Sequence, residues 1–147
     1  MDRVLSLFPF CLPRKVDGTP FMITASDPTI LLVDDDLSVV AMLQHALAQA
    51  GYQVIVASDA MEALQRHEAE RGAVDLLITD LQMPQMSGQE LARGLRKQRS
   101  DLPILFISGN PDAEAILRAE AFPKSKFLAK PFMPSELLAL LPELLNG

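Results

Sequence analysis

From residue 29 onward, short apolar runs alternate with stretches whose apolar residues recur at helical spacing. The apolar runs cover residues 30–33, 54–57, 74–79, 102–107 and 127–129. Helical spacing follows each run, over residues 37–50, 60–69, 86–95, 112–121 and from 135 onward. Five strands that are each followed by a helix predict an α/β fold, in which a five-stranded parallel sheet is doubly wound and helices cover both faces.

Several helix boundaries can be predicted from single residues. Asp59 and Ser135 are placed to cap the second and the last helix, and Pro123 should end the fourth. Pro142 should kink or end the last helix, because proline lacks the N–H that a helix interior needs.

In an open parallel sheet, ligands bind at the carboxyl ends of the strands. Reactive side chains stand at four of the five predicted strand ends. They are Asp34, Asp35 and Asp36 after the first strand, Asp80 after the third, Ser108 after the fourth and Lys130 after the fifth. The fold should therefore gather these carboxylates, a hydroxyl and an amine in one pocket.

This set of side chains suits phosphoryl chemistry. Adjacent carboxylates repel and raise one another's pKa, so they favour a bound cation, and oxygen ligands suit Mg²⁺. Lys130 and Ser108 are natural donors to phosphate oxygens. Asp80 stands alone after the central strand, which makes it the candidate nucleophile for an aspartyl phosphate. Asp36 is expected to begin the first helix, where a carboxylate is stabilised by the helix dipole.

Residues 29–145 resemble the receiver domain of two-component response regulators. Four motifs carry the resemblance in the same order: LLVDDD, LITDLQMPQMSG, ILFISG and FLAKPF. Each motif is weak alone, but the combination is highly specific. The resemblance implies a flavodoxin-like (βα)5 receiver fold for residues 29–147.

The resemblance also implies a role for each residue of the pocket. Asp80 would accept the phosphoryl group. Asp35, Asp80 and the backbone carbonyl of Gln82 would bind Mg²⁺, and Asp34 would complete the acidic pocket.

Three further roles follow from the same resemblance. Lys130 would pair with the phosphoryl group, and the Lys130–Pro131 peptide bond would be cis. Ser108 would donate a hydrogen bond to the phosphoryl group and move toward it. Phe127 would be the switch aromatic that changes rotamer with Ser108.

A receiver implies protein partners rather than a classical enzyme. The phosphoryl donor would be a histidine kinase or a histidine phosphotransfer protein, and the only activities expected are self-phosphorylation and self-dephosphorylation. The output surface would be the fourth helix, fifth strand and fifth helix. The net charge of −6, and a chain that leaves no room for a helix-turn-helix, predict no direct nucleic-acid contact. A single-domain response regulator is the main hypothesis, and a receiver of a hybrid histidine kinase is the alternative.

Two other readings remain open from the residues. A haloacid-dehalogenase-type phosphatase would use Asp34 as nucleophile and Asp36 as acid and base, but it would leave Asp80 unexplained and lacks an acidic pair after Lys130. A pseudo-receiver would bind partners without phosphorylation, which the complete set of pocket residues disfavours.

Residues 1–28 differ from the remainder in their many prolines. We expect a poorly ordered extension; a partner-docking or membrane-touching arm, or a translation start at Met22, are alternatives. The single cysteine, Cys11, and the absence of a secretory signal or a membrane span predict a cytoplasmic protein.

Local patterns predict whether three groups of side chains are solvated or buried. His45 and His67 should be solvated. Six leucines between residues 137 and 145 exceed what one buried stripe needs, which indicates either a core helix with exposed leucines or an apolar partner surface. The basic cluster near the end of the third helix should be a solvated helix end; it comprises Arg93, Arg96, Lys97 and Arg99.

Overall fold

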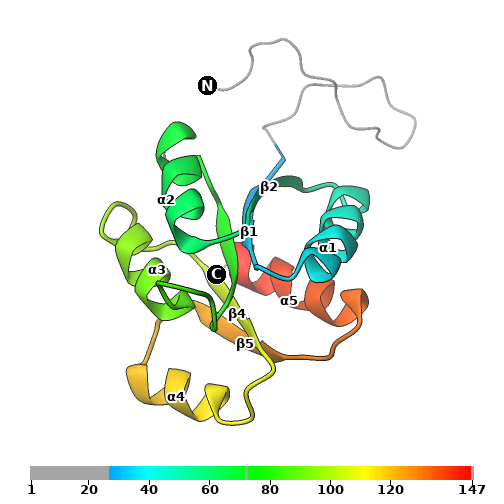
Figure 1. Ribbon diagram of the computed structural model, residues 1–147. Coiled ribbons are helices and arrows are strands. Elements are labelled where there is room, and N and C mark those ends of the chain that lie inside the picture. The colour runs from blue at the N-terminus through cyan, green and yellow to red at the C-terminus, as the bar shows by residue number, and fades with distance from the viewer. Residues whose placement is uncertain (1–26, 72, 147) are drawn as a thin grey trace, which may run out of the picture.

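The computed structural model describes residues 27–71 and 73–146 (Figure 1). Its five strands form one parallel sheet in the order β2-β1-β3-β4-β5, which confirms the predicted fold class. The strands are β1 (Thr29–Val33), β2 (Gln53–Ala57), β3 (Leu76–Asp80), β4 (Ile104–Ser108) and β5 (Ser125–Ala129). The helices are α1 (Leu37–Gln49), α2 (Ala60–Ala69), α3 (Gly88–Arg96), α4 (Ala113–Glu120) and α5 (Pro134–Asn146).

The two faces of the sheet are covered by different helices. Helices α1 and α5 pack on one face, and α2, α3 and α4 pack on the other (Figure 1). The strand order reverses direction at β1, because the chain passes from β1 to β2 on one side and then to β3 on the other. This reversal is the point where doubly wound sheets bind their ligands.

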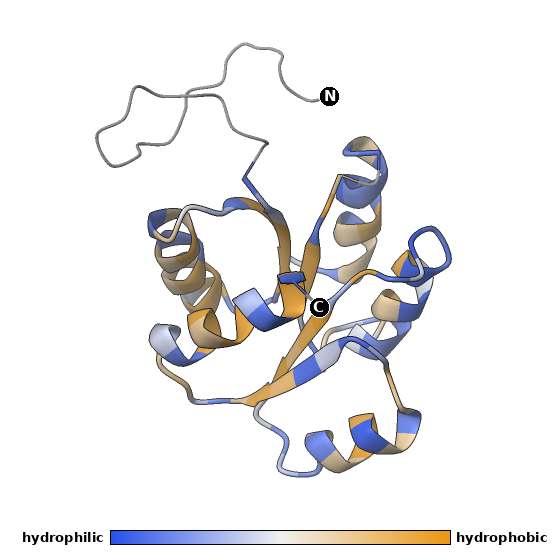
Figure 2. Ribbon diagram, turned by 180° about the vertical axis from the view of Figure 1, so that it is seen from behind, coloured by the Kyte–Doolittle hydropathy of each residue, from blue (hydrophilic) through white to orange (hydrophobic). Residues whose placement is uncertain are grey.

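Strand β1 shows how apolar side chains fill the sheet interior up to the strand end, apart from the buried Thr29 at its start. Its five residues are all buried. Ile30 and Leu32 pack toward α1 and α5, whereas Leu31 and Val33 pack toward α2, α3 and α4. Figure 2 shows the same arrangement as apolar strands between helices whose outer sides are polar. Charged side chains that follow such strands therefore gather at the carboxyl edge.

Side-chain caps begin three of the helices. Asp59 accepts a hydrogen bond from the Glu62 N–H at 2.8 Å, as predicted for α2. Ser87 and Glu90 form a reciprocal capping box at the start of α3, which satisfies two backbone N–H groups. The capping box fixes where α3 starts relative to the end of β3.

The start predicted for the last helix is wrong, and Pro142 does not end this helix. Helix α5 begins at Pro134, one residue before the predicted cap Ser135, and the Glu136 carboxylate accepts the Met133 N–H at 2.7 Å. The helix also continues through Pro142 to Asn146. Leu141 and Leu144 are buried on either side of Pro142, so packing against the sheet holds the final turn.

The leucines of α5 are accounted for by packing within the domain. Leu137, Leu141 and Leu144 are buried in the core between α5, α1 and the sheet. The other three pack partly buried against the same core; they are Leu138, Leu140 and Leu145. None of the six is an exposed residue, so α5 offers no leucine-rich outer surface.

The basic cluster on and after α3 is solvated only in part, because Arg93 and Lys97 are exposed whereas Arg96 and Arg99 are partly buried and bonded. Arg93 pairs with Glu120 at 3.2 Å. The Arg96 guanidinium donates to the Leu102 carbonyl at 2.8 and 3.1 Å and also to the carbonyl of Pro123. Arg99 donates to the Val74 carbonyl and pairs with Asp101 at 3.3 Å. These contacts tie the segment between α4 and β5 to α3.

His67 is buried, whereas His45 is exposed as predicted. His67 lies on α2 with 1% of its surface exposed, and neither ring nitrogen has a hydrogen-bond partner among the described residues. Burial and the positive charge of Arg99 lower the pKa of His67, and the side chain of Gln98 offsets part of this effect.

The predicted extension, residues 1–28, lies outside the described residues except for its last two, so its proposed disorder, arm and start at Met22 stay predictions. Within the described part of the chain, no helix is long and apolar enough to cross a membrane.

The buried imidazole predicts that stability falls on acidification. In the unfolded chain His67 titrates near 6.5, and folding lowers its pKa. Its contribution is complete above pH 6.5 and is lost as pH falls through the folded pKa, because the unfolded state then binds the extra proton. We expect His67→Phe to flatten the dependence of the free energy of unfolding on pH in urea titrations. His45→Gln is the control and should leave the slope unchanged; a wild-type slope in His67→Phe would contradict the prediction.

Candidate functional site

The carboxyl ends of β1 and β3 bring three carboxylates together. The nearest oxygens of Asp34, Asp35 and Asp80 all lie within 4.8 Å of one another. Asp34 is fully buried, Asp80 is 7% exposed and Asp35 is exposed. Two acids therefore form the floor of the pocket, and one stands at its mouth.

Lys130 supplies the positive charge of the pocket. Its ammonium group lies 3.1 Å from Asp34 Oδ2 and 3.5 Å from Asp80 Oδ2. The Lys130 backbone N–H donates to the Ser108 carbonyl at 2.9 Å, and the Lys130–Pro131 peptide bond is cis, as predicted. Lys130 is thus held from its backbone at the end of β5 while its side chain reaches the acids.

The charges of the pocket change the pKa values of two of these groups. Burial raises the pKa of Asp80, the Asp34 carboxylate adds to this effect, and Lys130 and the Gln82 N–H partly offset it. For Lys130, burial works against the charged form, but its hydrogen bond to Asp34 and the charges of both acids raise its pKa overall. A further positive charge next to Asp80 would therefore lower its pKa and favour the ionised carboxylate.

Asp36 has a different role from its two neighbours. Its side chain accepts hydrogen bonds from the N–H groups of Ser38 at 2.9 Å and Val39 at 3.4 Å, so it caps α1 as predicted. Asp34 Oδ1 in turn accepts the Asp36 N–H at 2.9 Å. A phosphatase mechanism that needs Asp36 as acid and base does not fit this capping arrangement.

The remaining predicted residues lie at the end of β4, directly after β3 and on β5. Ser108 is 1% exposed at the end of β4, and its hydroxyl oxygen accepts the Asn110 N–H at 3.0 Å. Gln82 is exposed, and its backbone N–H donates to Asp80 Oδ1 at 3.3 Å. Phe127 lies on β5, half-buried against the core formed with α2, α3 and α4.

Two residues at the site were not singled out from the sequence. The buried Thr79 hydroxyl donates to the Asp80 carbonyl at 2.9 Å. Gly88, the first residue of α3, lies so close to the same carbonyl that a Cβ would be 2.4 Å from it. Gly88 closes the motif LITDLQMPQMSG, so the signal was present, but only the packing of α3 on β3 gives the reason for a glycine.

The donor set fits a hard divalent cation. Three carboxylates meet within 4.8 Å, and a single ammonium group, from Lys130, contacts two of them. Carboxylate and carbonyl oxygens are the ligands that Mg²⁺ prefers, usually with several waters retained. The exposed Asp35 is the acid through which an ion can enter from solvent.

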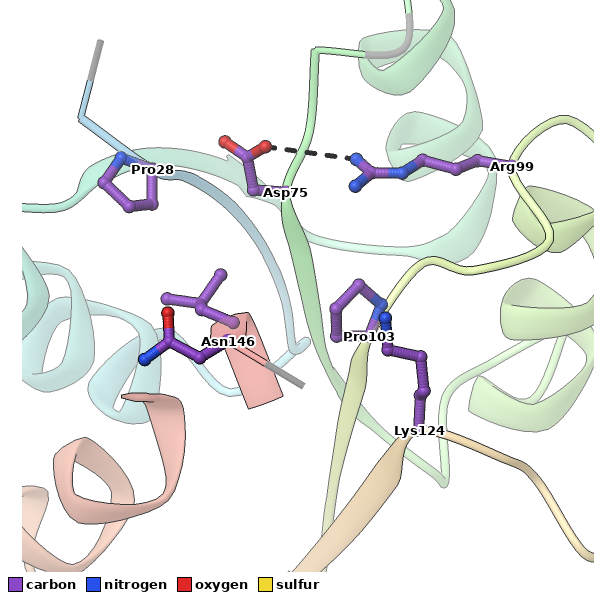
Figure 3. Close-up of a pocket in the computed structure, with 7 residues that line it drawn as sticks. Pro28, Asp75, Arg99, Pro103, Lys124 and Asn146 are labelled. Carbon is purple, nitrogen blue, oxygen red and sulfur yellow. Dashed lines mark ion pairs between the residues drawn. The ribbon is translucent and has the colours of Figure 1, made fainter. Parts of the chain in front are cut away.

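A separate cavity lies at the opposite edge of the sheet. It has a volume of about 310 Å³, and its lining includes Asp75, Arg99, Pro103 and Lys124 (Figure 3). These residues precede or flank the amino ends of β3, β4 and β5, and Arg99 faces Asp75 at 4.0 Å. None of the predicted site residues lines this cavity, so the acidic pocket and not the cavity carries the reactive groups.

The chain belongs to the response regulator receiver domain family, whose family model matches residues 30–142. The chain is 35% identical over 117 residues to the alkaline phosphatase synthesis transcriptional regulatory protein PhoP of Bacillus subtilis, a match covering 80% of this chain and 48% of PhoP. It is 37% identical over 118 residues to the sensor kinase CckA of Brucella abortus, which covers 80% of this chain and 12% of CckA.

The fold agrees with solved receiver structures. The chemotaxis response regulator CheY4 of Vibrio cholerae superposes with a TM-score of 0.73 at 34% identity, covering 81% of this chain and 99% of CheY4. The chain thus spans a whole CheY4 molecule but only about half of PhoP. The predicted family and fold are confirmed, and the chain is a signalling receiver domain.

The charge balance of the pocket can be tested by removing Lys130. In Lys130→Met, the buried Asp34 carboxylate loses its ion-pair partner, and we expect a loss of about 2 kcal/mol in the free energy of unfolding, since Lys130 is partly solvated. The pKa of Asp80 should rise further, because Lys130 now lowers it. Carboxyl ¹³C NMR titration measures that pKa. Lys126→Met, which removes an exposed pair with Glu143, is the control, and an unchanged Asp80 pKa in Lys130→Met would contradict the assignment.

Proposed function

We propose that this receiver accepts a phosphoryl group on Asp80 from a phosphohistidine of a histidine kinase or histidine phosphotransfer protein. The observation that supports this most is the position of Asp80, which lies at the end of the central strand with its carboxylate 3.5 Å from the Lys130 ammonium that also pairs with Asp34. Asp80 pairs with the lysine and keeps a small exposed fraction of 7%, whereas Asp34 is fully buried and Asp35 makes no ion pair with the lysine in the described part of the chain.

The transfer step follows from this arrangement. An Asp80 carboxylate oxygen forms a bond to phosphorus while the bond from phosphorus to the donor nitrogen breaks, and the nitrogen leaves with the electron pair. Lys130 would neutralise the phosphoryl oxygens, since its ammonium group already lies 3.5 Å from Asp80. Such transfer requires positioning and charge stabilisation more than covalent assistance.

Asp35, Asp80 and the Gln82 backbone carbonyl would hold Mg²⁺, with Asp34 beside them. The bound ion would supply neutralisation of the acids and of the incoming phosphoryl oxygens. The raised pKa of Asp80 supports this assignment, since further positive charge would favour the ionised nucleophile.

Phosphorylation would then be transmitted by Ser108 and Phe127. The Ser108 hydroxyl oxygen accepts the Asn110 N–H in this structure, and a new phosphoryl group would draw the hydroxyl toward Asp80 as a donor. Phe127 would change rotamer with it, altering the surface formed by α4, β5 and α5. A local charge change would thus shift a two-state surface that a downstream protein reads.

The location, partners and activity of the domain are proposed on the same grounds. The domain would act in the cytoplasm through protein contacts, without direct nucleic-acid binding, and would catalyse only its own phosphorylation and dephosphorylation. A receiver within a hybrid histidine kinase is the second candidate, supported by the similarity to the CckA sensor kinase and to the solved CckA receiver, which is 32% identical.

The nucleophile is tested with acetyl phosphate and Mg²⁺, followed by intact mass spectrometry. We expect one phosphoryl group on the wild type and none on Asp80→Asn, because the amide is not a nucleophile. Asp112→Asn is the matched control, since this exposed side chain makes no capping hydrogen bond, and it should be labelled like the wild type. Equal labelling of Asp80→Asn would overturn the proposal. Repeated turnover of a small phosphomonoester would instead favour the phosphatase reading.

A further inference from the structure

The contact between Gly88 and the peptide of Asp80 is far closer than those at Gly94 and Gly109, where a Cβ would meet its nearest atom at 3.7 and 3.9 Å. A Cβ at residue 88 would lie 2.4 Å from the Asp80 carbonyl oxygen and 3.1 Å from the Leu81 Cα. Both neighbours are backbone atoms, which cannot rotate aside as a flexible side chain can. The helical backbone at Gly88 is open to any residue, so the missing side chain is required by space and not by conformation.

We propose that Gly88 is a positioning residue for the phosphoacceptor: its bare Cα lets α3 lie directly against the Asp80 peptide, and this contact sets the direction of the Asp80 carboxylate. This inference rests on the proposed function, which assigns Asp80 as the reacting group.

The Asp80–Leu81 peptide is held from two sides. On one side the Thr79 hydroxyl, on a fully buried side chain, donates to the Asp80 carbonyl at 2.9 Å. On the other side its own N–H, that of Leu81, donates to the Ile107 carbonyl at 3.1 Å, and the Gly88 N–H donates to the next carbonyl along the chain, that of Leu81, at 3.0 Å. The capping box of Ser87 and Glu90 fixes the first turn of α3 at this place. The peptide cannot shift without breaking one of these contacts.

The position of this peptide controls the chemistry because the carboxylate has close partners. Asp80 lies 3.5 Å from the Lys130 ammonium and accepts the Gln82 N–H at 3.3 Å. A displacement of about 1 Å at a reacting group can slow a reaction about a hundredfold. An added methyl group at residue 88 must move either α3 or the Asp80 peptide by an amount of that order, since real Cβ contacts do not occur at 2.4 Å.

Helix α3 contains its own control. A Cβ at Gly94 would meet only Leu64 Cδ2, at 3.7 Å, which is an ordinary van der Waals contact. Gly94→Ala therefore adds the same methyl group to the same helix without touching the site, and alanine favours a helix.

The test compares Gly88→Ala with Gly94→Ala at a temperature where thermal unfolding shows both to be folded. At saturating Mg²⁺, Gly88→Ala should be phosphorylated by acetyl phosphate about tenfold to a hundredfold more slowly per folded molecule, and Gly94→Ala at the wild-type rate. The pKa of Asp80, read by carboxyl ¹³C NMR, should shift in Gly88→Ala only. A residue that served folding alone would lower the melting temperature and leave both readouts unchanged.

A second variant covers the case in which Gly88→Ala does not fold. Thr79→Val keeps the branched shape and removes the donor to the Asp80 carbonyl, so it should lower the same rate several-fold and shift the same pKa. Thr29→Val, at the start of β1, is its control. Wild-type rates and an unshifted Asp80 pKa in folded Gly88→Ala or Thr79→Val would overturn the inference. Because the pKa is measured without phosphorylation, the inference is tested even if Asp80 proves not to be the phosphoacceptor.

Discussion

The ion pair between Lys130 and Asp34 is the interaction on which the rest of the site depends. A fully buried carboxylate is strongly unfavourable without a compensating charge, and the Lys130 ammonium supplies that charge at 3.1 Å. The two residues come from β1 and β5, which are separated in the sheet by β3 and β4. The lysine side chain therefore reaches over the end of β3, and Asp80 becomes its second partner. The order of the strands in the sheet thus determines which charged side chains meet in the pocket.

Helix α3 links this pocket to the far side of the domain. Its first residue, Gly88, lies against the Asp80 peptide. Near its last turn, Arg93 and Arg96 stack on the Phe122 ring at 5.4 and 6.0 Å, and Phe122 packs on Phe106 of β4 at 5.1 Å. The segment between α4 and β5 is thereby attached to the helix that begins beside the Asp80 peptide. It is an irregular segment, in which Ala121 and Lys124 both have positive φ, and the Arg96 hydrogen bonds hold it in place.

The fold, and the residues that meet in the site, could be predicted from the sequence because both depend on the regular alternation of strands and helices. Alternating apolar runs and helical stretches imply a parallel sheet, and carboxyl ends of parallel strands share one edge, so Asp34, Asp80 and Lys130 had to meet. Features that depend on how separate elements pack were not predictable. His67 looks solvated among polar neighbours, yet the approach of the Gln98 and Arg99 region buries it. Ser135 was predicted as the cap of α5, but it lies inside the helix, which starts at Pro134 and is capped by Glu136 from within its first turn.

Asp34, Asp35 and Asp80 would form a divalent-cation site, since Lys130 balances their charge only in part. Thermal unfolding at increasing Mg²⁺ tests this most directly, in the wild type and in Asp35→Asn. The melting temperature of the wild type should rise with the logarithm of the Mg²⁺ concentration once the site begins to fill, because the ion binds the folded state only. Asp35→Asn should be at least as stable as the wild type without Mg²⁺, since one repelling charge is removed, and should respond little to the ion. A wild-type melting temperature that does not change with Mg²⁺, or an equal rise in both proteins, would contradict the account.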